Sequence, residues 1–301
     1  MTDQANLWEL PDPISVHEVN LDDKTSILLR RHGNPDGIRL VLSHGNGLAI
    51  DFYYPFWSRL LEEFDLFVYD MRNHGWNAVG DLSDHNVPTL VNDHDRIIEE
   101  IRVQYGDKPQ VGVYHSLSSL TPLLSELKGS QYSALVLFDP PLCKPGRSFF
   151  DFEEAAVRMS KSTRRRTFQF KAKKSFTDLY NIFPTYKAAV PGVVELLADT
   201  TLRESPDGGG FELRCPREYE AQIVDYASIF GVFIDFSKVR CPVKVVGADP
   251  TLPYSYLPSL NLSDISSVDY DFLPDATHML QLEQPEECVA IMREFVDAVL
   301  D

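Results

Sequence analysis

The stretch Gly112-Val-Tyr-His-Ser-Leu-Ser-Ser119 follows a short apolar run and precedes a segment that we expect to be helical at residues 120–127. A serine on such a tight turn is lifted clear of a sheet, and the N-terminus of the next helix favours negative charge that develops beside it. Turns of this kind usually read G-x-S-x-G, whereas Tyr114 and Ser118 stand here in place of the two glycines. Ser116 is therefore a candidate nucleophile, and the evidence for this role must come from motifs elsewhere in the chain.

Short β-rich runs alternate with helical stretches on both sides of this turn, a pattern typical of a mostly parallel sheet flanked by helices. The central runs are almost continuously apolar, as expected of strands that are buried on both faces. The first two alternate more and lie closer together, as in an antiparallel edge hairpin. We predict an α/β fold with eight strands, at residues 14–19, 26–31, 39–43, 66–70, 111–114, 134–138, 243–246 and 268–273.

About a hundred residues between Phe138 and Val243 show no buried-strand pattern, and compact domains rarely contain a structureless loop of that length. We therefore predict an inserted helical subdomain at residues 144–238, between two parts of one core at 1–143 and 239–301. Residues 144–187 carry eleven basic side chains against four acidic ones, a local charge of +7 in a chain whose net charge is −17. This stretch is also rich in aromatic residues.

The net charge of −17 and the isoelectric point near 4.8 disfavour binding to nucleic acids or to anionic membrane surfaces. The N-terminal segment has neither the basic region nor the apolar core of a secretory signal, and no apolar run reaches the roughly 18 residues of a membrane span. The four cysteines form no C-x-x-C pair and no zinc-like spacing. We expect a cytoplasmic protein with reduced thiols, no metal and no cofactor.

A second turn, Ser43-His-Gly-Asn-Gly47, ends an earlier apolar strand. Glycines at such a position let the backbone approach a ligand closely. The backbone N–H groups of Asn46 and Leu117 could together hold a developing oxyanion, and one such donor is typically worth about 3 kcal/mol in the transition state. A simple turn after a strand is the alternative. The nearby segment Asp70-Met-Arg-Asn-His-Gly75 is expected to brace this loop.

Near the C-terminus, His278 follows the last predicted strand and precedes a predicted helix at residues 285–300. It would take the proton of Ser116 and later deliver one to the leaving group. Asp249, at the end of the strand before it, would fix the tautomer of the histidine; Asp139, at the end of an earlier strand, is the alternative acid. With Asp249 the order along the chain is serine, acid, histidine.

Several motifs together resemble the landmarks of the α/β-hydrolase fold superfamily: HGNG at 44–47, DMRNHG at 70–75, YHSLSS at 114–119, GADP at 247–250 and ATHMLQLEQPEE at 276–287. The resemblance covers roughly residues 14–140 and 240–300. The last motif is similar to the H-x-x-x-x-E-x-P ending of capped members, which implies that the insert is a cap over the active site. Serine at the nucleophile position, where epoxide hydrolases and haloalkane dehalogenases carry aspartate, favours acyl chemistry.

The resulting hypothesis is a serine hydrolase that cleaves a small acyl substrate, such as an ester, thioester or lactone, through an acyl-enzyme. Hydrolysis of a carbon–carbon bond and a lyase reaction on the same triad are alternatives, and a non-catalytic ligand-binding module is an alternative of another class. For the substrate we consider two contacts. The phenol of Tyr114 could reach a neighbouring pocket, and Arg165 in the basic part of the insert could pair with an anionic group; a solvated or bracing face is the alternative for these cations.

Overall fold

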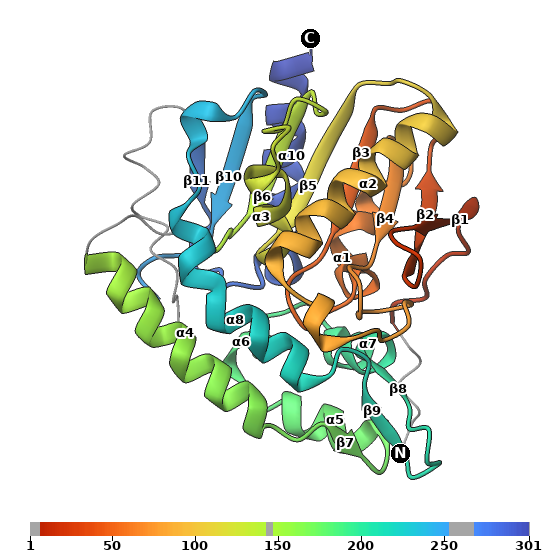
Figure 1. Cartoon of the computed structure of the whole chain (residues 1–301), viewed down its shortest axis with the longest axis vertical. Coiled ribbons are helices and arrows are strands. Elements are labelled where there is room, and N and C mark those ends of the chain that lie inside the picture. The colour runs from red at the N-terminus through yellow and green to blue at the C-terminus, as the bar shows by residue number, and fades with distance from the viewer. Residues whose placement is uncertain (1–6, 143–146, 253–267, 301) are drawn as a thin grey trace.

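All eight predicted strands are present in the computed structural model, which describes residues 7–142, 147–252 and 268–300. They are β1 (Ser15–Asn20), β2 (Ser26–Gly33), β3 (Arg39–Ser43), β4 (Asp65–Tyr69), β5 (Gln110–His115), β6 (Ala134–Phe138), β10 (Val243–Gly247) and β11 (Asp269–Phe272). The strands form one sheet in the order β1-β2-β4-β3-β5-β6-β10-β11 (Figure 1). Only β2 runs against its neighbours β1 and β4, so the predicted edge hairpin and mostly parallel sheet are confirmed.

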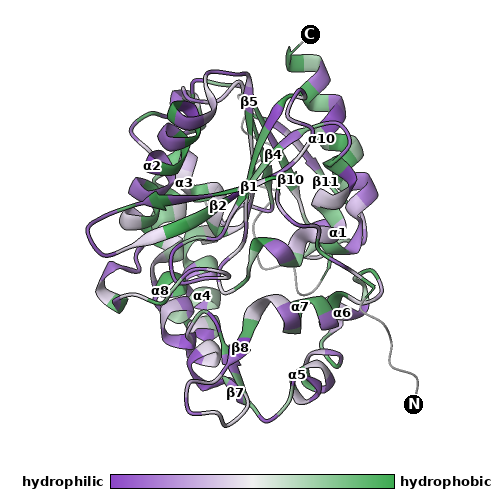
Figure 2. Cartoon of the chain, turned by 90° about the vertical axis from the view of Figure 1, so that its right-hand side faces the viewer, coloured by the Kyte–Doolittle hydropathy of each residue, from purple (hydrophilic) through white to green (hydrophobic). Residues whose placement is uncertain are grey.

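The central strands are buried along their whole length because helices cover both faces of the sheet. Figure 2 shows α2 (Val87–Tyr105) and α3 (Leu117–Leu124) on one face, and α1 (Tyr54–Trp57) and α10 (Pro285–Leu300) on the other. Successive side chains of a strand point to opposite faces, which divides the core into two clusters. Leu40 and Leu42 belong to the cluster under α1 and α10, whereas Val41 belongs to the cluster under α2 and α3.

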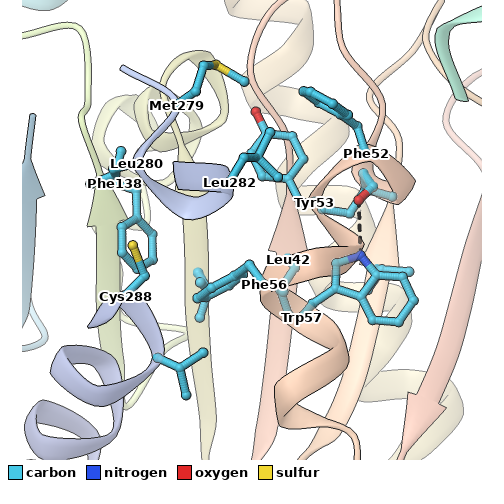
Figure 3. Close-up of a cluster of buried hydrophobic side chains, with 14 of the residues drawn as sticks. Leu42, Phe52, Tyr53, Phe56, Trp57, Phe138, Met279, Leu280, Leu282 and Cys288 are labelled. Atoms are coloured by element: carbon cyan, nitrogen blue, oxygen red, sulfur yellow. Dashed lines mark hydrogen bonds between the residues drawn. The ribbon is translucent and has the colours of Figure 1, made fainter. Parts of the chain in front are cut away.

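The cluster under α1 and α10 combines aliphatic side chains with several large aromatic ones (Figure 3). Phe56, Trp57 and Phe138 are fully buried there, and each contributes about 1.5–3 kcal/mol through burial of its side chain. The indole nitrogen of Trp57 donates a hydrogen bond to the carbonyl of Ile50 at 3.1 Å (Figure 3). This packing fixes α1, and with it the loop that follows β3.

Residues 147–238 form an insert that lies beyond the carboxyl ends of the parallel strands (Figure 1). It contains α4 (Arg147–Arg165), β7 (Gln169–Phe170), α5 (Lys173–Tyr180), α6 (Pro184–Lys187), α7 (Val193–Thr201), β8 (Leu202–Glu204), β9 (Phe211–Leu213) and α8 (Arg217–Val232). The expectation of a purely helical insert is therefore incomplete, because β7, β9 and β8 form a small antiparallel sheet. Strands of two or three residues are too short to show an alternating pattern in the sequence.

The remaining elements are short: η1 (Ile50–Tyr53), η2 (Ser58–Leu60), η3 (Leu82–Asp84), η4 (Phe236–Lys238) and α9 (Leu280–Glu283). Across the described ranges, no helix combines the length and apolar character that crossing a membrane requires.

Candidate active site

Ser116 occupies the sharp turn between β5 and α3. Its backbone adopts φ 51° and ψ −118°, a combination that costs a non-glycine residue about 1–3 kcal/mol and is found mainly at functional sites. The turn is held by a hydrogen bond from the N–H of Ser116 to the carbonyl of Phe138 at 3.0 Å. Leu117 is the first residue of α3, so its N–H has no partner within the helix.

The structure shows how the turn does without its two usual glycines. The ring of Tyr114 packs against Gly112, where an added Cβ would lie only 2.6 Å from a ring carbon. Gly112, two residues before Tyr114, therefore provides the room that the tyrosine ring needs. The Tyr114 hydroxyl is hydrogen-bonded to that of Tyr132 at 2.8 Å, and the side chain is fully buried in the core. The hypothesis that Tyr114 contacts the substrate is therefore wrong. Ser118 fits at the other position because its hydroxyl bonds the backbone of His115 at 3.1 and 2.9 Å.

Three side chains from distant parts of the chain form a continuous hydrogen-bonded row. The Ser116 hydroxyl lies 3.0 Å from Nε2 of His278, and Nδ1 of His278 lies 2.6 Å from Oδ2 of Asp139. With Nδ1–H donating to the carboxylate, Nε2 is left to accept the serine proton. Asp139 is held in place because its other oxygen accepts a hydrogen bond from the N–H of Ala248 at 3.0 Å.

Asp249, the acid that we preferred from the sequence, is used elsewhere, and this preference needs correction. Its Oδ1 accepts hydrogen bonds from the N–H and the hydroxyl of Thr251 at 2.8 and 2.6 Å, and its Oδ2 accepts one from the N–H of Asp275 at 2.9 Å. It therefore ties together the loops that follow β10 and β11. The physical reason is the strand order: β6 adjoins β5, which carries the serine turn, whereas β10 lies one strand farther away.

The His278 loop is braced by Glu283, the glutamate of the H-x-x-x-x-E-x-P motif, for which we predicted no role. The carboxylate of Glu283 accepts hydrogen bonds from the N–H of Thr277, at 2.5 Å, and from its hydroxyl. Burial raises the pKa of Glu283, and the bonds from Thr277 oppose this rise. The contact between Glu283 and Thr277 could have been predicted from the H-x-x-x-x-E-x-P motif.

The glycine-rich turn after β3 is held by buried neutral side chains. The N–H of Gly47 donates to Nε2 of His74 at 3.0 Å, and the N–H of Gly45 donates to the phenol of Tyr53 at 3.1 Å. Because burial lowers the pKa of His74 to about 3, this ring is neutral and can accept. Asp70 accepts a hydrogen bond from the N–H of Ile50 at 2.8 Å, so the segment 70–75 braces the turn as expected.

Tyr53 and His115 connect this turn to His278. The Tyr53 phenol donates to Nδ1 of His115 at 2.7 Å, and Nε2–H of His115 donates to the backbone carbonyl of His278 at 2.8 Å. Burial lowers the pKa of His115 well below 6.5, so the ring is neutral. A neutral ring has one nitrogen that accepts, here Nδ1, and one that donates, here Nε2. His115 is thus structural, as expected, while the part played by Tyr53 had no signal in the sequence.

A cavity of about 460 Å³ opens beside Ser116. Asn46, Leu117 and His278 line it together with the serine. Most of its remaining lining residues belong to the insert, and the majority of these are apolar or aromatic, including Phe152, Met159, Phe176, Tyr180, Phe183 and Ile223.

Among the described Lys and Arg residues, Arg166 reaches this cavity and Arg165 does not. Arg165 is exposed at the end of α4 and lies outside the cavity wall, so the hypothesis of a substrate contact from Arg165 is wrong. Arg166 lines the cavity and is paired with Glu220 of α8. The neighbouring Arg164 pairs with Glu218 and Asp225, which supports the bracing alternative for this cation.

Within the described residues, one group of possible metal ligands brings His74, His85 and Cys215 within 4.8 Å of one another. Both ring nitrogens of His74 are engaged there, since Nδ1 donates to the carbonyl of Arg72 at 2.9 Å and Nε2 accepts from Gly47. The group therefore has no free lone pair at His74 to offer a metal ion.

The family model described as the alpha/beta hydrolase family matches residues 40–291. The chain belongs to the alpha/beta hydrolase family. Among solved structures, E-2-(acetamidomethylene)succinate hydrolase is similar over 94% of this chain and 99% of its own, with a TM-score of 0.73 and 17% identity. The thioesterase domain from the curacin biosynthetic pathway is similar over 93% of this chain and 99% of its own, with a TM-score of 0.70 and 14% identity.

A thermophilic esterase from Thermogutta terrifontis is similar over 95% of this hydrolase and 99% of its own chain, with a TM-score of 0.66 and 17% identity. At these identities the likeness shows the shared fold. No curated protein sequence matches this hydrolase.

Proposed function

We propose that this hydrolase cleaves small acyl substrates, such as esters, thioesters or lactones, through an acyl-enzyme on Ser116. The serine oxygen attacks the carbonyl carbon while its proton passes to Nε2 of His278, and Asp139 stabilises the imidazolium that forms. The backbone N–H groups of Asn46 and Leu117 hold the oxyanion. The leaving group departs with the proton of His278, and a water molecule activated by the same histidine then hydrolyses the acyl-serine.

The observation that carries this proposal is the hydrogen-bonded row Ser116–His278–Asp139 at the wall of a cavity. A module that only binds a ligand needs neither the strained turn at Ser116 nor a histidine whose tautomer is fixed by a buried acid. Solved structures that share the fold include a thioesterase domain and an esterase, in line with acyl-transfer chemistry.

We further propose that the insert acts as a cap that selects uncharged substrates. Arg166, the Lys or Arg residue in the described part of the cavity wall, is already matched by Glu220. The cavity wall is mainly apolar and aromatic, so it favours the hydrocarbon part of a ligand.

Labelling with a fluorophosphonate tests the proposal directly, because this reagent phosphonylates an activated serine. We expect one label per chain on Ser116, no label in Ser116→Ala, and hydrolysis of short p-nitrophenyl esters that is lost in the same variant. Ser119→Ala is the matched control, since Ser119 is buried in α3 nearby and should leave labelling intact. Intact folded protein that takes up no label and binds the esters without turnover would favour the ligand-binding module.

A further inference from the structure

The cavity wall contains one ion pair among its mainly apolar side chains. In the part of the wall that the structure describes, Arg166 and Glu220 are the only residues of the Asp, Glu, Lys and Arg types. The pair is bidentate: Nη1 of the arginine donates to Oε1 at 2.9 Å, and Nη2 donates to Oε2. Side-chain exposures of 28% for Arg166 and 13% for Glu220 show that part of each side chain is accessible.

This pair lies directly against the proposed oxyanion turn. A Cβ added to Gly47 would lie only 2.2 Å from Oε2 of Glu220, so the carboxylate packs on the glycine itself. The backbone carbonyl of Glu220 also accepts a hydrogen bond from the side chain of Asn46 at 2.9 Å. The two charged groups are therefore fixed beside the residue whose N–H would hold the substrate carbonyl.

Stability alone does not call for an ion pair at this position, because well-packed apolar side chains of similar volume are often as stable or more stable. Burial raises the pKa of Glu220, whereas Arg166 acts to lower it. The pair also has zero net charge, so it adds little to the attraction of an ionic ligand. What it does offer the cavity is a fixed hydrogen-bond acceptor next to a fixed donor.

We propose that Arg166 and Glu220 form a subsite for a hydroxyl or amide group that lies within a few bonds of the scissile carbonyl. This inference rests on the proposed function and narrows its substrate class. A hydroxyl group can donate to the carboxylate of Glu220 and accept from the guanidinium of Arg166 at the same time. A second carboxylate at this place would face both Glu220 and the developing oxyanion, so an anionic substrate is disfavoured.

The hydroxyl or amide group can belong to the acyl chain or to the leaving group, and two pairs of esters distinguish these sources. The first pair is p-nitrophenyl 3-hydroxybutyrate and p-nitrophenyl butyrate. The second is 2-hydroxyethyl butyrate and ethyl butyrate. In one of the two pairs we expect kcat/KM to favour the hydroxyl compound by about tenfold or more, because buried polar groups left unpaired penalise the analogue that lacks the hydroxyl. The anionic mono-p-nitrophenyl succinate should react no faster than the butyrate.

Variants assign this preference to the ion pair. The variant Arg166→Met/Glu220→Met removes both charges together. In the ester pair that shows the preference, its ratio of kcat/KM for the hydroxyl compound to kcat/KM for the analogue without the hydroxyl should fall to near one. The conservative Glu220→Gln keeps the shape of the side chain and should lower the ratio even if the double variant does not fold. Arg164→Met is the matched control, because Arg164 is paired with Glu218 and Asp225 outside the cavity wall and its loss should leave the ratio unchanged.

Equal kcat/KM within both ester pairs for the wild-type enzyme would overturn the inference, and so would faster turnover of the succinate or a preference that survives in the variants. Failure of the proposed function has a different signature, since Ser116 would then take up no fluorophosphonate and none of the esters would be hydrolysed.

Discussion

Asp139 accepts a hydrogen bond from Nδ1 of His278 at 2.6 Å, although 139 residues separate the two in the sequence. Their contact joins the end of β6 to the loop that follows β11. The acid is nearly inaccessible, with 2% of its surface exposed, so water cannot replace the bond. Because Asp139 bonds His278 whereas Asp249 bonds Thr251 and Asp275, substitutions of the two acids should have different effects.

Asp139→Asn should lower kcat for a p-nitrophenyl ester by about 10³–10⁴-fold, because the amide NH2 in place of Oδ2 would donate to Nδ1 and fix the wrong tautomer, and a neutral amide does not stabilise the imidazolium. Asp249→Asn serves as the control. It should lower the free energy of unfolding by about 1 kcal/mol, through weaker bonds to Thr251 and Asp275, and leave kcat within about threefold. Steady-state kinetics with urea unfolding measure both, and a larger kcat loss in Asp249→Asn would contradict the assignment.

Tyr53→Phe should lower kcat by about 10- to 100-fold with little change in KM. The substitution leaves the N–H of Gly45 and Nδ1 of His115 without their partner, which loosens the oxyanion turn and the backbone of His278 together. Tyr69→Phe is the matched control, because the buried Tyr69 phenol bonds His94 at 3.0 Å on the other face of the sheet. Equal kcat losses in the two variants would mean that Tyr53 supports only the core.

Tyr114→Phe should destabilise the protein without changing substrate binding. Removal of the phenol oxygen leaves the hydroxyl of Tyr132 with one partner fewer, at a cost of about 1 kcal/mol in the free energy of unfolding. The ring stays in the core, so KM for every ester should match the wild-type value. A selective rise in KM would instead return Tyr114 to the substrate site.

Acid should destabilise the fold from about pH 6.5 downward. Burial lowers the pKa of His94 to about 3 and that of His44 to about 4, so both are neutral in the folded state while the unfolded chain takes up protons near pH 6.5. Their contribution to stability is complete above pH 6.5 and is lost as the pH falls toward the folded-state values. Each such histidine lowers the free energy of unfolding by about 1.4 kcal/mol per pH unit in that window.

Urea unfolding at pH 7, 6 and 5 measures this slope. In His94→Gln the slope between pH 6 and pH 5 should be smaller than in the wild type by about 1.4 kcal/mol per pH unit, because glutamine does not titrate. An unchanged slope would show that His94 is protonated in the folded state.

The sheet was predictable because its signal is local. Almost continuous apolar runs such as 39–43 and 134–138 can be buried only between two helical layers, and the motifs at their ends place Asn46, Ser116 and His278 at one edge. Each of these inferences needs only the residues around the strand end. For the same reason α10 was expected with its observed bounds, Pro285–Leu300.

The acid and the substrate contacts were not predictable because they depend on distances between elements. Asp139 and Asp249 both end buried strands, and only the spatial order β5-β6-β10 distinguishes them. Arg165 and Arg166 differ by one position at the end of α4, which decides which of them faces the cavity. Glu220 reaches Gly47 from α8, and no pattern near either residue indicates this contact.

The place of the insert in the chain has a consequence during translation. Ser116 and Asp139 end adjacent strands that are synthesised before residues 147–238, whereas His278 is synthesised after them. A ribosome-bound chain that has reached the insert carries Ser116 and Asp139 without the histidine that bonds to both. On the proposed mechanism, Ser116 therefore stays unreactive toward acyl substrates until β10, β11 and the loop of His278 have left the exit tunnel.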